Sequence, residues 1–289
     1  MRPGGRAGWL VDLSSRLGDL ERLEEALAVV EEGVTIFRQL AQVRPDAFLP
    51  DLAMSLNTES VCLSDLEREE EALAAAEEAV TIFRQLAQAD PDAFLPDLVA
   101  ALNTQLDHLY DLGRREEALA AAQEAVTICR QLARIRPAGN LPGLAMSLNT
   151  QSVCLSDLGR REEALAAAEE AVDIFRHRAE ADPDVFLPGL ARSLNTQSVC
   201  LSGLGRRQEA LAAAEEAADI FRHRAEADPD VFLPFLATSL TNLANILSEL
   251  NRDAEASAIR DEANATVRVL TRLREERVND QATAQPSDP

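Results

Sequence analysis

The sequence predicts an all-α fold, an α-solenoid of about six helix-turn-helix repeats with a period of 46 residues. A Glu-Ala pair recurs in every copy at a fixed distance from one leucine, as in Glu163-Ala164. The composition is rich in Ala, Leu, Glu and Arg, with only 4% aromatic residues, which is typical of helical proteins. Constant spacing without insertions is expected when each repeat stacks on the next in the same geometry. The leucines that define the period are Leu20, Leu66, Leu112, Leu158, Leu204 and Leu250.

Each repeat contains two amphipathic segments. The longer one is predicted to be a helix over residues 67–87, where apolar residues fall three or four positions apart. Glu69, Glu70 and Glu71 lie in its first turns and Arg84 lies near its end, as the helix dipole favours. A shorter helix is predicted over residues 98–109, because its leucines line one side.

The two kinds of connection differ. The turn within a repeat is short, and Gly159 suits the left-handed position that follows a helix. The connection between repeats, residues 89–96, offers Asp90 as an N-cap and Pro91 at the first helical position. Pro96 lacks an amide hydrogen, so we expect a break or kink there. The recurring aromatics of this connection are expected to fill the seam between repeats, and they are Phe48, Phe94, Phe186 and Phe232.

The array is predicted to cover residues 1–276, followed by a disordered polar tail over 277–289. The first repeat has a shortened first helix, and the polar last helix is typical of a terminal cap. The junction at residues 138–140 reads Ala-Gly-Asn and departs from the other copies. The predicted repeats are residues 5–45, 46–91, 92–137, 138–183, 184–229 and 230–276.

The repeat resembles a known family. Residues 240–247 read Leu-Thr-Asn-Leu-Ala-Asn-Ile-Leu, a Gly-x-x-x-Glu-Ala turn occurs at 205–210, and an Asp-Pro closer occurs at 228–229. These residues resemble the tetratricopeptide repeat (TPR), in the longer variant of the kinesin light chain, over about residues 5–276. The resemblance implies a right-handed superhelix whose first helices line a concave groove and whose second helices form the convex wall.

Asparagine and threonine side chains follow the motif leucine of the first helices, where the resemblance implies a groove. An amide offers both a donor and an acceptor, so such a row could bind the backbone of an extended peptide. The alternative is that these asparagines only hold neighbouring first helices in place. The candidate groove residues are Asn57, Asn103, Asn149, Asn195, Thr58, Thr104, Thr150, Thr196 and Asn242.

No pattern indicates a catalytic, cofactor or metal site. Cys62, Cys154 and Cys200 share one position with His108 and Ile246, which indicates a buried core site. Cys129 replaces the repeated phenylalanine of the second helices, and His177 and His223 are two copies of one site that we expect to be exposed. No Cys-x-x-Cys or His-x-x-x-His motif occurs, and the recurring Glu-Glu pairs are typical of a solvated helix face.

The net charge is −22, which disfavours nucleic acid and anionic membranes as partners and favours basic ones. The alternative is that this charge only keeps the array soluble. We find no secretory signal and no run of eighteen apolar residues, so we expect a cytoplasmic protein without a membrane span. The favoured function is a non-enzymatic scaffold that binds a protein or peptide. The alternative is a regulatory or sensor array that acts by self-association, as a homo-oligomer, or by controlling a separate effector.

Overall fold

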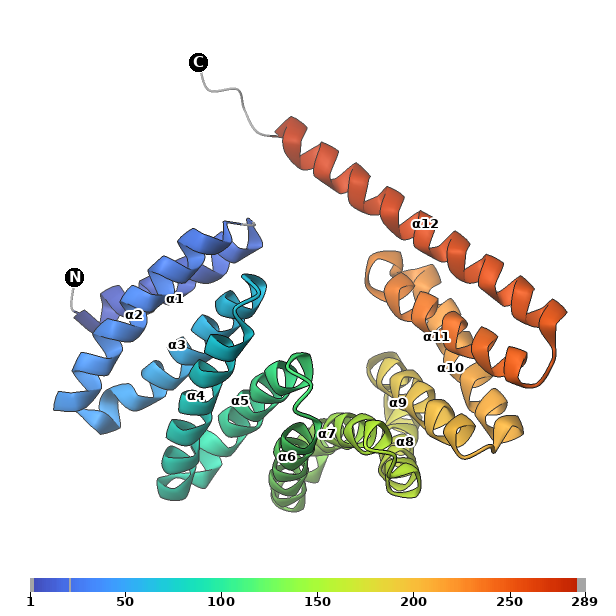
Figure 1. The fold of residues 1–289 in the computed structure, drawn as a ribbon, viewed down its shortest axis with the longest axis horizontal. Coiled ribbons are helices and arrows are strands. Elements are labelled where there is room, and N and C mark those ends of the chain that lie inside the picture. Colours follow the sequence, from blue (N-terminus) through green and yellow to red (C-terminus); the bar gives the residue numbers. More distant parts are fainter. Residues whose placement is uncertain (1–2, 21, 285–289) are drawn as a thin grey trace. The chain divides into compact units, whose positions relative to one another are not determined.

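The computed structural model describes residues 3–20 and 22–284, and in these ranges the chain forms helices and short turns without any strand. Consecutive helices pair as antiparallel hairpins, which confirms the predicted all-α repeat (Figure 1). The helices are α1 (Pro3–Asp19), α2 (Leu23–Val43), α3 (Pro45–Asp65), α4 (Glu69–Ala89), α5 (Pro91–Asp111), α6 (Arg115–Ile135), α7 (Pro137–Asp157), α8 (Arg161–Ala181), α9 (Pro183–Gly203), α10 (Arg207–Ala227), α11 (Pro229–Glu249) and α12 (Asp253–Ala284).

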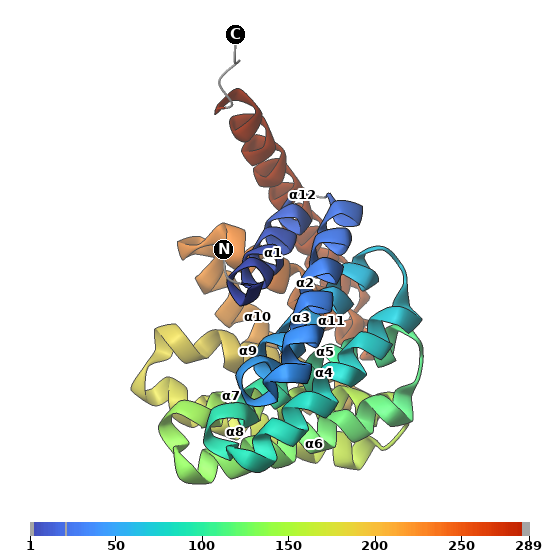
Figure 2. The same cartoon turned by 90° about the vertical axis from the view of Figure 1, so that its left-hand side faces the viewer.

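The hairpins form two compact units, Met1–Asn140 and Leu141–Pro289, called unit 1 and unit 2 below. Within unit 1, each helix from α1 to α6 packs against the next along the chain, and Figure 2 shows α1 and α2 side by side. Within unit 2, the same stacking joins α8 through α12. The boundary between the units falls at Asn140, in the stretch where the repeat departs from its consensus.

The alanine of the recurring Glu-Ala pair is fully buried in every copy. Alanine has high helix propensity and a small side chain, so it lets two helices approach closely without loss of helix stability. This explains how a chain with few aromatic residues builds a close-packed core. The buried alanines are Ala26, Ala72, Ala118, Ala164, Ala210 and Ala256.

The first helices are longer than the sequence predicted. The expected shorter helix over 98–109 and the break at Pro96 are wrong, because α5 begins at Pro91 and continues through Pro96. The Asp90 side chain accepts a hydrogen bond from the Ala93 amide at 3.2 Å, so the helix is already capped one turn before Pro96. Pro96 therefore removes only one ladder bond near the helix start, where its ring is tolerated. The aromatics expected in a loop thus lie in the first turns of α3, α5, α9 and α11.

The turn within each hairpin follows the prediction. Gly159 has a φ of 73°, and its amide donates to the Ser156 carbonyl at 2.9 Å. The next amide, of Arg160, reaches back to the Leu155 carbonyl at 2.9 Å, so the end of α7 is capped. Glu67 adopts a φ of 59° at the same position of an earlier repeat, where a side chain makes the left-handed conformation more costly.

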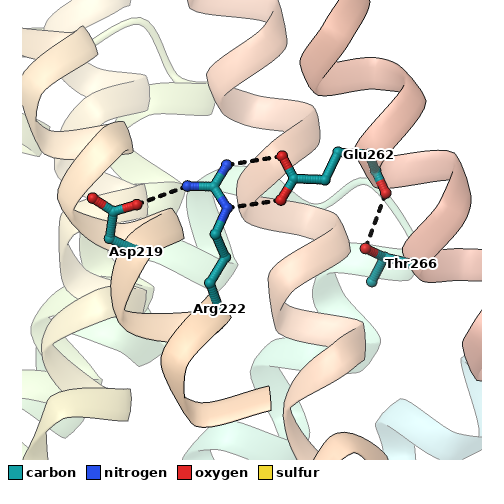
Figure 3. A network of polar contacts seen from close by, with 4 residues as sticks. All are labelled: Asp219, Arg222, Glu262 and Thr266. Atoms are coloured by element: carbon teal, nitrogen blue, oxygen red, sulfur yellow. Dashed lines mark hydrogen bonds and ion pairs between the residues drawn. The ribbon is translucent and has the colours of Figure 1, made fainter. Parts of the chain in front are cut away.

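Arginine–glutamate pairs join successive second helices. Figure 3 shows Arg222 of α10 between Asp219 of the same helix, at 2.7 Å, and Glu262 of α12, at 2.7 and 3.0 Å. Thr266 lies beside them and donates to the Glu262 carbonyl at 3.0 Å. Such half-exposed pairs add little stability each, and they recur at a constant spacing of 40 residues. The matching pairs are Arg38–Glu78, Arg84–Glu124 and Arg176–Glu216.

The last hairpin differs from the others. Helix α12 runs to Ala284, so it covers residues 277–284, where we expected disorder, and the remaining tail, 285–289, lies outside the described residues. Helix α11 is long and apolar enough to cross a membrane by length and composition alone, and 44% of that stretch is buried in the protein. One such helix among the described residues is weak evidence for a membrane span, because a core helix passes the same test.

Candidate functional site

A groove of about 580 Å³ runs over the first helices of unit 2. It is lined only by α7, α9 and α11, the helices for which the resemblance implied a groove. Val153 and Val199 contribute apolar surface, with 44% and 50% of each residue exposed. Thr196 and Asn245 add polar groups beside them. Apolar surface with a few polar groups is the usual lining of a binding site.

A second hollow of about 390 Å³ lies in the same unit, around the N-terminal halves of α7 and α9. Phe235 of α11 borders it and stacks on buried Phe221 of α10, with the ring centroids 5.6 Å apart. The Arg192 guanidinium lies 5.9 Å from the Phe235 centroid. The exposed thioether of Met146 also lines this hollow. The groove and the hollow together give unit 2 an apolar first-helix face.

The predicted asparagines join neighbouring first helices. Asn149 Nδ2 donates to Ser193 Oγ at 2.8 Å, and Asn195 Nδ2 donates to Ser239 Oγ at 2.5 Å. Asn242 Nδ2 reaches Ser198 Oγ at 2.6 Å in the opposite direction. In unit 1, Asn57 Nδ2 donates to Thr104 Oγ1 at 3.2 Å. These bonds are what the alternative interpretation required, in which the asparagines align adjacent helices.

The amide oxygens of three of these asparagines are shielded from solvent. The Oδ1 atoms of Asn57, Asn149 and Asn195 are buried and have no hydrogen-bond partner among the described residues. Asn103 differs, because its side chain is exposed. Binding of a peptide backbone by this row therefore stays a prediction, and only Asn103 presents an open side chain.

The threonines of this row keep acceptor capacity, and Thr196 lines the groove while Thr150 lines the second hollow. Thr150 and Thr196 donate their hydroxyl hydrogens to the carbonyls of Met146 and Arg192, one turn earlier, at 3.3 and 3.2 Å. Thr58 and Thr104 do the same in unit 1. A hydroxyl that donates in this way still has lone pairs that can accept a bond from a ligand.

Sequence reasoning missed the apolar part of the groove. Val153 and Val199 stand four residues after Asn149 and Asn195, so helical spacing places each on the same face as its asparagine. The same valine recurs as Val61 in unit 1. A projection of the first helix from the predicted asparagines would have found it.

Acidic residues gather on the first helices of unit 1. Burial and then the nearby Glu31 carboxylate raise the pKa of Glu59, which lies on α3. Burial also raises the pKa of Asp51, Asp97 and Asp107, on α3 and α5. The groove of unit 2 has one carboxylate in its lining, that of Asp157. The first-helix carboxylates with raised pKa values therefore all belong to unit 1.

The cysteines occupy core positions, as predicted. Burial raises the pKa of Cys62 and Cys200, and it raises the pKa of Cys154 to about 11. Such thiols are poor nucleophiles at neutral pH, because the thiolate is the reactive form. His177 and His223 have exposed side chains, each with Nδ1 3.5 or 3.6 Å from the carboxylate of a glutamate one turn away, which confirms the expected exposure.

One titratable cluster was not foreseen. The buried His108 Nδ1 lies 3.5 Å from Glu69 Oε2, and a carboxylate oxygen of Asp111 completes a group whose ligand atoms lie within 4.8 Å of one another. Short sequence motifs could not indicate this cluster, because Glu69 and His108 lie on different helices, α4 and α5.

Comparison with known proteins identifies the repeat. The tetratricopeptide repeat model matches residues 109–133 and 236–263. The crystal structure of BtubC (BKLC) from P. vanneervenii is 18% identical, with a TM-score of 0.65 over 92% of this chain and 94% of that one. A putative kinesin light chain from Podosopora anserina is 20% identical, with a TM-score of 0.62 over 79% of this chain and 99% of that one. The chain is a tetratricopeptide repeat protein.

Other matches agree with this TPR fold. A model of anaphase-promoting complex subunit 5 matches residues 48–92, 141–183 and 191–246. A STAND protein with a TPR sensor, PH0952 from Pyrococcus horikoshii, is 17% identical, with a TM-score of 0.66 over 97% of this chain and 38% of that one. No curated protein matches the sequence significantly.

Proposed function

We propose that this TPR protein is a non-enzymatic scaffold, and that the first-helix groove of unit 2 holds an apolar segment of a partner protein. The observation that carries the proposal is the exposed apolar lining around Val153 and Val199, which borders a groove of about 580 Å³. Exposed apolar surface in a hollow is costly in water, and a bound segment would cover it. Polar groups at its sides, such as those of Thr196 and Asn245, would orient that segment.

A basic partner, expected from the net charge, is supported only in unit 1. The carboxylates of α3 and α5 lie in partly desolvated positions with raised pKa values, and opposite charges would relieve the cost of their ionisation. The groove of unit 2 contributes one carboxylate, so its ligand is chosen by apolar surface.

An enzymatic role has little chemical support in the described residues. The thiols with raised pKa values are buried, and the exposed histidines stand alone on helix faces with glutamates one turn away. TPR folds are typically non-enzymatic, and the proposal follows that rule for this chain.

The test places charge in the groove and the same charge elsewhere. Val153→Asp with Val199→Asp introduces two carboxylates into the groove lining. The control, Val267→Asp with Val269→Asp, introduces them at similarly exposed positions of α12, 48% and 45%. Circular dichroism and thermal melts first establish that both variants fold like the wild type.

Affinity capture from extract then compares the three proteins. We expect a partner that is retained by the wild type and by the α12 control and is lost by the groove variant. Retention by both variants would refute groove binding and move the interface to another face.

The second candidate is a sensor array that acts through self-association or a separate effector. Its support is the fold similarity to the TPR sensor of the STAND protein PH0952. Light scattering of the pure protein separates the two, since a concentration-dependent dimer lost in the groove variant would favour self-association through that surface.

A further inference from the structure

The cluster of Glu69, His108 and Asp111 departs from the repeat in two of its three residues. Position 69 holds glutamate where the next three copies have Arg115, Arg161 and Arg207, and position 108 holds histidine where four of the other copies have cysteine or isoleucine. Both departures meet at one place, the contact between α4 and α5 in unit 1. Asp111 stands at a position that is acidic in most copies.

Glutamate in place of arginine at position 69 reverses the charge of this side chain at the α4–α5 contact. At the α10–α11 contact, Arg207 Nε lies 3.6 Å from Glu249 Oε2, so a cation faces the acidic residue. At the α4–α5 contact the corresponding residues are Glu69 and Asp111, which are both acidic. Two carboxylates this close repel each other unless a positive charge lies between them. The repeat therefore lacks its usual cation where the histidine appears.

His108 itself lacks hydrogen-bond partners. The residue is 3% exposed, and both imidazole nitrogens are buried without a hydrogen bond among the described residues. Glu69 Oε2 is likewise buried and unbonded, while Oε1 accepts from Ser64 at 2.9 Å. A buried polar atom without a partner costs free energy, so these atoms point to a ligand that would satisfy them. The Nδ1 atom faces Glu69, which directs the imidazole into the cluster.

We propose that Glu69, His108 and Asp111 bind a divalent transition-metal ion of the Zn²⁺ type. One imidazole nitrogen with two carboxylates is a ligand set for such ions, whereas Mg²⁺ and Ca²⁺ prefer oxygen alone. Water completes the coordination of a three-ligand zinc site. Bonds of about 2.1 Å hold tetrahedral ligands roughly 3.4 Å apart, so atoms that lie as far as 4.8 Å apart need to close by roughly 1.4 Å. The exposed carboxylate of Asp111 has room to make that movement.

Such an ion joins the second hairpin to the third, because Glu69 belongs to α4 and the other two ligands belong to α5. Binding to the folded state alone stabilises that state by mass action. The proposal is independent of the groove, whose lining residues all belong to unit 2.

The test uses Zn²⁺ and variants taken from the repeat itself. Glu69→Arg restores the residue of the later copies, and His108→Ile restores the residue of α11, so both are compatible with the fold. Asp111→Asn removes the third ligand. The matched control is Asp65→Asn, which removes the corresponding acid of α3, where no histidine stands beside it. All variants keep the four cysteines, so binding of Zn²⁺ by thiols is common to all.

Isothermal titration calorimetry of chelator-treated protein, with thermal melts, reads out binding. We expect one Zn²⁺ per wild-type chain, a higher melting temperature with Zn²⁺, and a loss of affinity of roughly tenfold or more in the three ligand variants. The control should bind like the wild type. Absence of stoichiometric binding, or equal binding by all variants, would overturn the proposal.

Discussion

Gly189 of α9 offers a sharp test of packing within unit 2. A Cβ added at this position would lie 2.4 Å from Cε1 of Phe175 and 2.7 Å from two further ring atoms. Phe175 lies on α8 and is 4% exposed, so its ring cannot swing into solvent without uncovering apolar surface. Gly143 occupies the same position of α7, and a Cβ there meets no described atom within 4 Å. The two glycines therefore make a matched pair.

Two opposing effects on the free energy of unfolding decide the outcome. Gly→Ala inside a helix stabilises by about 1 kcal/mol, and this gain applies to both positions. Overpacking a core costs about 1–3 kcal/mol, and this cost applies only to Gly189→Ala. We therefore expect Gly143→Ala to raise stability by about 1 kcal/mol, whereas Gly189→Ala ranges from neutral to about 2 kcal/mol destabilising. The melting temperatures of the two variants should differ by about 5 °C.

Thermal and guanidinium unfolding followed by circular dichroism measure this difference. Because repeat arrays can unfold in parts, whole curves are compared in place of one midpoint. A double variant, Gly189→Ala with Phe175→Leu, makes room beside the new methyl group and should recover part of the loss. Equal stabilisation by Gly143→Ala and Gly189→Ala would refute the argument, since it would mean that the Phe175 ring does not fill the space beside Gly189.

Two further predictions concern the half-buried carboxyl of Glu59 and the buried thiol of Cys154. Burial raises the pKa of Glu59, so ionising this carboxyl in the folded protein lowers the free energy of unfolding. This loss is absent below the unfolded-state pKa of about 4.3, grows as the pH rises from there, and is complete above the folded-state pKa. Glu59→Gln, which installs the residue found at 105, 151 and 197, should raise the melting temperature at pH 7 and not at pH 3, and an equal rise at both would contradict the electrostatic cause. Cys154, with a pKa of about 11, should react with iodoacetamide at pH 8 far more slowly in the native protein than in guanidinium, and equal rates would show an accessible thiol.

The repeat and its hairpins could be predicted because one spacing constrains every copy. Constant loop length, the buried alanine and the glycine turn each repeat the same physical requirement, so agreement among copies confirms each element. The predicted helix break at Pro96 was wrong for a local reason. A proline in the second turn was given more weight than the Asp90 cap and Pro91 start that precede it, although the structure keeps all three in α5.

The site was harder to predict, because its properties depend on neighbouring helices. Periodicity places Asn149 and Asn195 on the first-helix face, but it cannot show that their amides are already bonded to Ser193 and Ser239 one repeat later. The Glu69–His108 contact was equally hard to predict, because the two unusual residues lie far apart along the chain. An alignment of the repeats shows that residues 69 and 108 both differ from most other copies, and pairing such positions across neighbouring helices would have predicted the contact.

The same alignment shows how similar hairpins present different surfaces. Asp51, Glu59, Asp97 and Asp107 of unit 1 correspond to Gly143, Gln151, Gly189 and Val199 of unit 2, while the alanines that hold the hairpins together do not change. Each substitution removes a carboxylate from a first helix and leaves the helix in place. Both helices of each hairpin contribute buried residues, and these four differences lie on the first helices. Unit 1 therefore presents carboxylates at places in the repeat where unit 2 presents glycine, glutamine or an exposed valine of its groove, so two arrays of one fold can differ in the ligands they select.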